Sequence, residues 1–359
     1  MNNIIYKAHS FIIALLVFFP LVTQVVGYPL PLFIPIYTFS VFTSILIWLH
    51  NKGCYLFIDI NWTALLLTLL TTVSIVFLIK GDGLDSKLLV KTALFLILLS
   101  MTPYQLLLSS YKALRVIATV TAPILIFFLL LGVFSGDAYR LFGVSLHDNY
   151  NAAAFSALFI SYLVQSKYIL YEYLVKSSFL TYAVMSGSKK FAIVGIFLII
   201  VDVLVKSKVR LFIVLMLVLA TTLLLFQPEV AEVLRFDNYL DRLYRIDESI
   251  SGRVDRIAYH VSNIERAPFF GTGDSSYSAH NVIIQAWSEG GLINFIILLL
   301  ILLALVFVPI KLGYELFPLF ILTIVFLMFG DHYYWDRYVT LYIVSLLPIS
   351  YFYNSNKLH

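Results

Sequence analysis

Apolar runs of roughly twenty residues recur along the whole chain, and each is long enough for a helix to cross the hydrocarbon core of a bilayer. By length and apolarity we count about twelve runs, near residues 9–27, 29–49, 61–79, 88–103, 113–134, 151–166, 168–185, 190–205, 211–226, 291–310, 316–330 and 338–353. The runs do not alternate as barrel strands would. The sequence therefore predicts an all-α integral membrane protein with about twelve transmembrane helices.

The composition excludes several other classes of protein. Hydrophobic residues make up 61% of the 359 residues and charged residues only 12%, whereas a soluble domain is about half apolar and about one quarter charged. The net charge of +4 gives no indication of nucleic acid binding. The single cysteine, Cys54, rules out an intramolecular disulfide and a cysteine metal cluster.

Lysine and arginine in the short loops predict the orientation, because cytoplasmic loops carry an excess of them. The excess falls on loops that would be inside if both termini were cytoplasmic, including the KSKVR cluster at 206–210. We therefore expect nine membrane helices in residues 1–226, an outer loop with short helices at 227–279, and three membrane helices in 280–359. In a bacterium, that outer loop would lie in the periplasm.

The outer loop 227–279 contains six arginines and no lysine. A guanidinium binds phosphate oxygens with a planar fork, whereas an ammonium is a point charge, so this bias points to phosphate. The alternative is a solvated face balanced by acidic residues, because Asp237, Asp241, Asp247, Glu248 and Asp255 are interspersed.

One segment of the loop, SGRVDRIAYHVSNIERAP at 251–268, predicts a helix with Ser251 as N-cap and Pro268 preventing its extension. The helical spacing of Val254, Ile257, Ala258, Val261 and Ile264 predicts the packing face, and Arg253, Arg256 and His260 share one flank. With Ser251 as cap, Arg253 would lie in the first turn, where free N–H groups favour an anion. The alternative for Arg253 is a surface residue of an amphipathic helix.

Three fragments together resemble the O-antigen ligase and O-antigen polymerase superfamily of bacterial polysaccharide enzymes. They are the turn SGSKKFAIVG (186–195), the arginine helix and glycine turn SGRVDRIAYHVSNIERAPFFGTG (251–273), and the histidine-asparagine start HNVIIQAWSEGGLIN (280–294). The loop GDHYYWDR (330–337) is also similar to an aspartate-tryptophan-arginine loop of some ligases. Lys189 stands where the family usually has arginine, and Asn294 where glycine is common.

The resemblance implies transfer of a glycan from undecaprenyl diphosphate to an acceptor hydroxyl at the periplasmic face of the inner membrane. His280 would be the general base, because imidazole titrates near neutral pH. Arg253, with Lys189, would stabilise the charge growing on the diphosphate, in place of a metal ion or cofactor. Further substrate-binding candidates for the diphosphate or glycan are Lys190, Arg256, Asn281, Arg140 and Arg337.

Two alternatives stay open. In a ligase the acceptor is a lipid A-core sugar, and in a polymerase it is another lipid-linked repeat from the same kind of donor. A lipid-linked oligosaccharide flippase or other transporter is a distant alternative, because a transporter places polar residues near the middle of the membrane. Here the mid-span charges are few, namely Glu172, Lys176 and Asp202.

Overall fold

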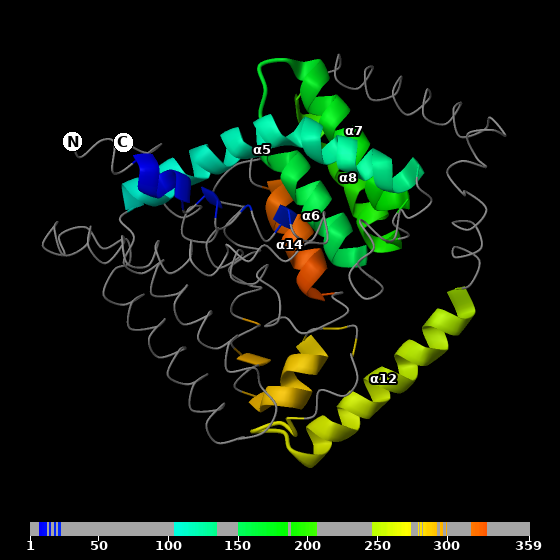
Figure 1. Cartoon of the computed structure of the whole chain (residues 1–359). Helices are drawn as coiled ribbons and strands as arrows, with labels where there is room; N and C mark the ends of the chain where they lie inside the picture. The colour runs from blue at the N-terminus through cyan, green and yellow to red at the C-terminus, as the bar shows by residue number, and fades with distance from the viewer. Residues whose placement is uncertain are drawn as a thin grey trace, which may run out of the picture.

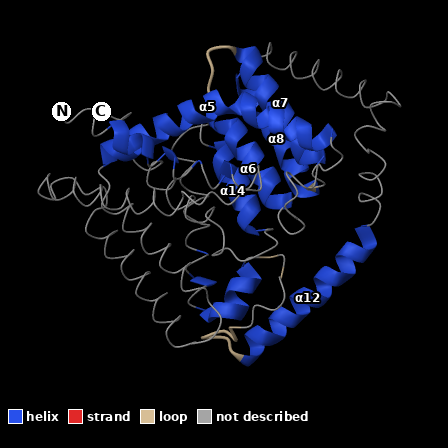
Figure 2. Ribbon diagram, in the orientation of Figure 1, coloured by secondary structure: helices blue, strands red, loops and turns tan. Residues whose placement is uncertain are grey.

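The structure is a computed structural model that describes residues 7–12, 14–15, 18, 21–22, 104–134, 150–185, 188–206, 246–273, 279, 281, 283–292, 295–296, 299 and 317–328. All regular secondary structure in these residues is helical (Figure 2). The all-α class is therefore confirmed for the part of the chain that the structure describes.

The labelled helices are α5 (Tyr104–Phe134), α6 (Tyr150–Leu163), α7 (Ile169–Met185), α8 (Lys189–Lys206), α12 (Ile246–Arg266) and α14 (Phe317–Met328). Five of them, α5 to α8 and α14, coincide with predicted apolar runs. Helix α5 begins nine residues before its run at 113, because Gln, Ser and Lys end an apolar run without ending a helix. The runs 29–49, 61–79, 88–103, 211–226 and 338–353 lie outside the described residues.

Helix α6 is the centre of a bundle, with α5, α7, α8 and α14 packed around it (Figure 1). Its residues are apolar on every face and buried almost without exception, including Phe155, Leu158 and Phe159. A helix that is apolar all round is expected in such a central position. Helix α8 comes close through Gly195, where a Cβ atom would lie 2.7 Å from Leu180 Cδ1 and 3.2 Å from Leu158.

The outer faces of the bundle are apolar as well. Val116, Val120, Ile124 and Phe127 of α5 are all more than half exposed, and α8 presents a similar row of exposed isoleucines and leucine. Contiguous exposed apolar surface of this kind suits a lipid environment better than water. Of the described helices, α5 alone contains a segment both long and apolar enough to cross a membrane, Tyr111–Leu129. The arrangement of twelve spans stays a prediction.

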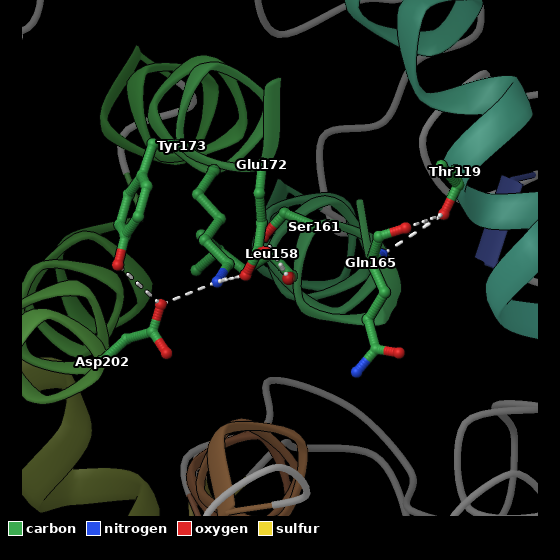
Figure 3. A network of polar contacts seen from close by, with 8 residues as sticks. Thr119, Leu158, Ser161, Gln165, Glu172, Tyr173 and Asp202 are labelled. Carbon is green, nitrogen blue, oxygen red and sulfur yellow. Dashed lines mark hydrogen bonds and ion pairs between the residues drawn. The ribbon is translucent and has the colours of Figure 1, made fainter. Parts of the chain in front are cut away.

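The three mid-span charges meet inside the bundle (Figure 3). Lys176 of α7 lies 2.6 Å from Glu172 Oε1, one turn earlier, and 2.8 Å from Asp202 Oδ2 on α8. Tyr173 also donates to Asp202 Oδ2, at 3.2 Å. The lysine and the aspartate are almost fully buried. The charges that interrupt run 168–185 are therefore paired with one another, as buried charges must be. We call Glu172, Lys176 and Asp202 the ion cluster.

Candidate functional site

Helix α12 begins five residues earlier than the sequence analysis predicts. It starts at Ile246, so Ser251 is an interior residue and the prediction that it caps the helix is wrong. Arg253 is consequently the eighth residue of α12 rather than a member of its first turn. The N–H groups around it are bonded within the helix. Any contact between Arg253 and phosphate would therefore depend on its guanidinium alone.

The face of α12 that is buried is also not the predicted one. His260 and Asn263 are buried, whereas Val254 is 59% and Val261 42% exposed, and Ala258 is exposed too. Three members of the expected packing stripe are thus exposed, Ile257 and Ile264 are half-buried, and the fully buried side chains belong to the polar flank. Arg256, one turn before His260, is exposed.

The partner of the buried flank is the helical segment 283–292. His260 Nδ1 lies 2.9 Å from Ser288 Oγ, and both side chains are fully buried. The His260 ring also meets Tyr259 edge to face, with ring centroids 5.5 Å apart. A histidine enclosed in this way joins two helices, which favours packing over glycan contact for His260.

Two glycine turns lock the same helices together at their C-terminal ends. Gly271 and Gly291 have φ of 66° and 73°, and a Cβ atom on either would overlap backbone of the other turn. Backbone hydrogen bonds complete the contact, from Thr272 N to Ser288 O (2.8 Å), from Gly273 N to Glu289 O (3.0 Å) and from Leu292 N to Pro268 O (3.0 Å). We call residues 267–273 and 288–292 the glycine junction.

Gly291 also changes how the following apolar run begins. A right-handed helix needs negative φ, so the φ of 73° at Gly291 is a local departure from helical geometry within the helical segment 283–292. We call this segment the short helix. It lies between Asn281 and the rest of run 291–310. Glu289 falls near the end of that short helix, not at a helix start, and its carboxylate accepts a hydrogen bond from Gln285 Nε2 at 2.7 Å.

Asn281 is the N-cap of this short helix. Its Oδ1 accepts hydrogen bonds from the backbone N–H groups of Ile283 (3.0 Å) and Ile284 (3.3 Å). The side-chain oxygen is therefore committed to the helix. Any hydrogen bond from Asn281 to a glycan or phosphate would have to come from its amide nitrogen.

The junction and the His260–Ser288 contact set the register between the two helices. Both helices run toward the junction, where these contacts hold them together (Figure 1), and we call them the two arms of the site. Seven residues back from His260 is Arg253, and seven back from Ser288 is Asn281. With a rise of 1.5 Å per residue, each lies roughly 10 Å up its arm from that contact. Arg253 and Asn281 therefore occupy matching levels on opposite arms.

The predicted lysine pair lies on another group of helices. Lys189 and Lys190 are the first two residues of α8, and the residue before them, Ser188, donates to Asn151 Oδ1 of α6 at 2.6 Å. That buried contact, rather than α12, positions the start of α8. Asn151 belongs to helix α6 and not to an outer loop. The ammonium of Lys190 lies 5.8 Å from the centre of the Phe191 ring.

Several predicted site residues lie outside the described residues. They are His280, Arg140 and Arg337, together with the side chains of Arg253 and Lys189. Their assigned roles stay predictions.

Three polar contacts were missed by the sequence analysis. They are His260–Ser288, Asn151–Ser188 and the ion cluster. Each joins residues far apart in the chain that no motif links. Only the ion cluster had a signal in the sequence, because charges within apolar runs have to find partners.

Comparison with known proteins adds no family assignment. Neither a protein-family model nor a curated protein matches the chain.

Proposed function

We propose that the chain is a membrane glycosyltransferase of the O-antigen ligase type. It would move a glycan from undecaprenyl diphosphate to a hydroxyl of a lipid A-core sugar at the periplasmic face of the bacterial inner membrane. The reaction would need neither a metal ion nor a cofactor. The fold in this proposal has about twelve membrane helices, cytoplasmic termini and the outer loop 227–279.

The observation that carries the proposal is the pair of arms formed by α12 and the short helix 283–292. Arg253 lies on one arm and Asn281, which directly follows His280, lies at the matching level of the other arm. Displacement at an anomeric carbon needs a base for the attacking hydroxyl and a cation for the leaving diphosphate, on opposite sides of that carbon. Two arms held in register by the junction suit this division, because they carry the two groups on separate helices.

The start of α8 supports a second contact to the diphosphate. Two lysines occupy its first turn, although the positive end of the helix dipole disfavours cations there. An anion bound at this position would meet the backbone N–H groups of the first turn as well as the two ammonium groups. The phosphates of a lipid-linked donor would supply that anion.

In this mechanism His280 accepts the proton of the acceptor hydroxyl as the hydroxyl oxygen attacks the anomeric carbon. The bond from that carbon to the diphosphate oxygen breaks, and the electron pair leaves with the undecaprenyl diphosphate. Arg253, Lys189 and Lys190 would stabilise the added charge. Arg256, Arg140, Arg337 and the amide nitrogen of Asn281 would bind the sugars or phosphates.

The ion cluster is the observation that bears on the transporter alternative. A transporter uses charges at the interface between two repeats, near the bilayer midplane. Lys176 instead pairs with carboxylates inside one helical hairpin, α7 and α8. Asp202 is thirteen residues from Lys189 along α8, or about 20 Å. The cluster therefore fits a structural role in the hairpin better than a transport path.

Deletion of the gene in its source bacterium, followed by a lipopolysaccharide gel, tests the proposal. Loss of all polymer from lipid A-core, with lipid-linked polymer retained, is the result expected for a ligase. Collapse of the ladder to a single repeat would instead identify the polymerase, which uses the same donor. Loss of polymer with the lipid-linked glycan trapped on the cytoplasmic face would instead indicate a flippase and overturn the enzyme.

A further inference from the structure

The apolar face of α12, formed by Val254, Ala258 and Val261, is turned away from the protein. Val254 is 59% and Val261 42% exposed, whereas the polar side chains of His260 and Asn263 on the opposite flank are buried. An amphipathic helix on a soluble protein normally buries its apolar side. Ile257 and Ile264 are half-buried, and the three exposed apolar residues suit an apolar environment outside the described protein.

Two further exposed aromatic residues follow at the end of the helix. Phe269 and Phe270 are 63% and 64% exposed. Their backbone is fixed to the start of apolar run 291–310, because Leu292 N donates to Pro268 O at 3.0 Å and to Phe269 O at 3.2 Å. In the proposed membrane enzyme this run enters the bilayer. The two phenylalanines are therefore held at the depth where lipid headgroups meet acyl chains.

We propose that α12 lies on the outer surface of the membrane, with its apolar face and Phe269–Phe270 immersed at the headgroup–acyl boundary. Interfacial helices bury their apolar side to a depth of about 5–10 Å. This inference rests on the membrane location in the proposed function and extends it. Lipid contact would hold the arm that carries Arg253 at the depth of the donor's diphosphate.

The charges of α12 predict whether its membrane binding depends on the charge of the lipid headgroups. Its three arginines, Arg253, Arg256 and Arg266, are outnumbered by Asp247, Glu248, Asp255 and Glu265, so the formal charge is 3 − 4 = −1. A helix with this charge gains nothing from anionic headgroups. Immersion should therefore occur in purely zwitterionic lipid and should be insensitive to salt.

Site-directed spin labelling of the full chain tests this proposal. Cys54 is replaced by serine, and single labelled cysteines are placed on the apolar face at 254, 258 and 261. Matched control labels go at Gly252, Asp255 and Arg266, which are exposed positions of the same helix outside the apolar face. Each protein is reconstituted in phosphatidylcholine nanodiscs. Collision rates are measured with oxygen, which concentrates in acyl chains, and with a water-soluble nickel chelate.

The expected result is a helical alternation. The ratio of oxygen to nickel collisions should be several-fold higher on the apolar face than at the control positions, with and without added salt. High nickel accessibility at all six positions would place the face in water and overturn the proposal. Low accessibility to both reagents on the apolar face would also overturn it, because another part of the protein would then cover that face.

The same samples separate this proposal from the proposed function. If α12 is immersed in lipid but the protein transfers no glycan from lipid-linked donor, the membrane contact of α12 is supported and the proposed glycosyltransferase is contradicted. Normal glycan transfer with a water-exposed apolar face would support the glycosyltransferase and contradict the membrane contact of α12.

Discussion

The ion cluster makes a quantitative prediction about stability. Lys176 lies 2.8 Å from Asp202 and 2.6 Å from Glu172, and its side chain is only 3% exposed. At an effective dielectric constant of about 20, a pair of unit charges 2.8 Å apart gains about 6 kcal/mol, most of which offsets desolvation. Removing one partner of a buried pair leaves the other charge buried without compensation, which typically costs about 3–5 kcal/mol of stability.

Lys176→Met is the most damaging single change that we expect in the cluster, because it leaves two carboxylates facing each other without a cation. With a typical unfolding entropy per residue, about 3–5 kcal/mol lowers the melting temperature of a chain of this size by about 4–7 °C. Asp202→Asn should cost less, about 1–3 kcal/mol. It keeps an oxygen for the Tyr173 hydroxyl and leaves the pair between Lys176 and Glu172.

A triple variant supplies the control. Glu172→Gln, Lys176→Met and Asp202→Asn together remove every charge, and replacing a whole buried ion pair is often close to neutral. Thermal unfolding in detergent can be monitored by size-exclusion chromatography. The triple variant should therefore have a higher melting temperature than Lys176→Met. The reasoning fails if Lys176→Met has the same melting temperature as the wild type, or if the triple variant is the least stable of the set.

Further predictions concern the glycine junction and the proposed catalytic groups. Gly291→Ala should lose at least about 1–2 kcal/mol of stability by thermal unfolding, because its φ is 73° and its Cβ atom would meet a backbone carbonyl. Gly252→Ala, a helical glycine with open space around it, should be neutral or stabilising, and the opposite ranking would contradict the geometry. In a purified assay with lipid-linked donor, His280→Ala should reduce turnover by about 10²–10⁴-fold while donor binding persists. Arg253→Ala should weaken both binding and turnover, by roughly 1.5–3 kcal/mol in binding; normal turnover in either variant would remove that residue from its role. Lys189→Arg should keep activity and Lys189→Ala should lose most of it, and a fully active alanine variant would exclude contact with the diphosphate.

The helices of the bundle could be predicted from the sequence, because the length and apolarity of a run are local properties. Runs 151–166, 168–185 and 190–205 match α6, α7 and α8 within about three residues. The start of α12 was missed because Ser251 looked like a cap. Asp247 and Glu248, which suit a first helical turn equally well, lie four and three residues earlier.

The site was less predictable, because it depends on contacts between distant segments. The sequence shows which side of α12 is apolar. It does not show that Ser288 contacts His260 on the polar flank. The glycines at 271 and 273 both have positive φ, and their turn approaches the backbone of the short helix closely. These two glycines lie against the end of the short helix, two turns away from Asn281, because Gly291 forms a second turn that fits the turn at 271–273.

In the proposed membrane enzyme, the shared ion cluster has a consequence for how the chain enters the membrane during synthesis. A charge placed alone at the centre of an inserting helix costs about 2.5–3.5 kcal/mol, and Lys176 lies near the centre of α7, whereas Glu172 lies in its first turn. The remaining partner, Asp202, is synthesised later, near the end of α8. Partitioning of α7 into lipid is therefore most favourable once α8 has left the ribosome and the two can insert as a hairpin. A chain stalled after Ser188 would present the translocation machinery with a helix whose lysine still lacks its second carboxylate.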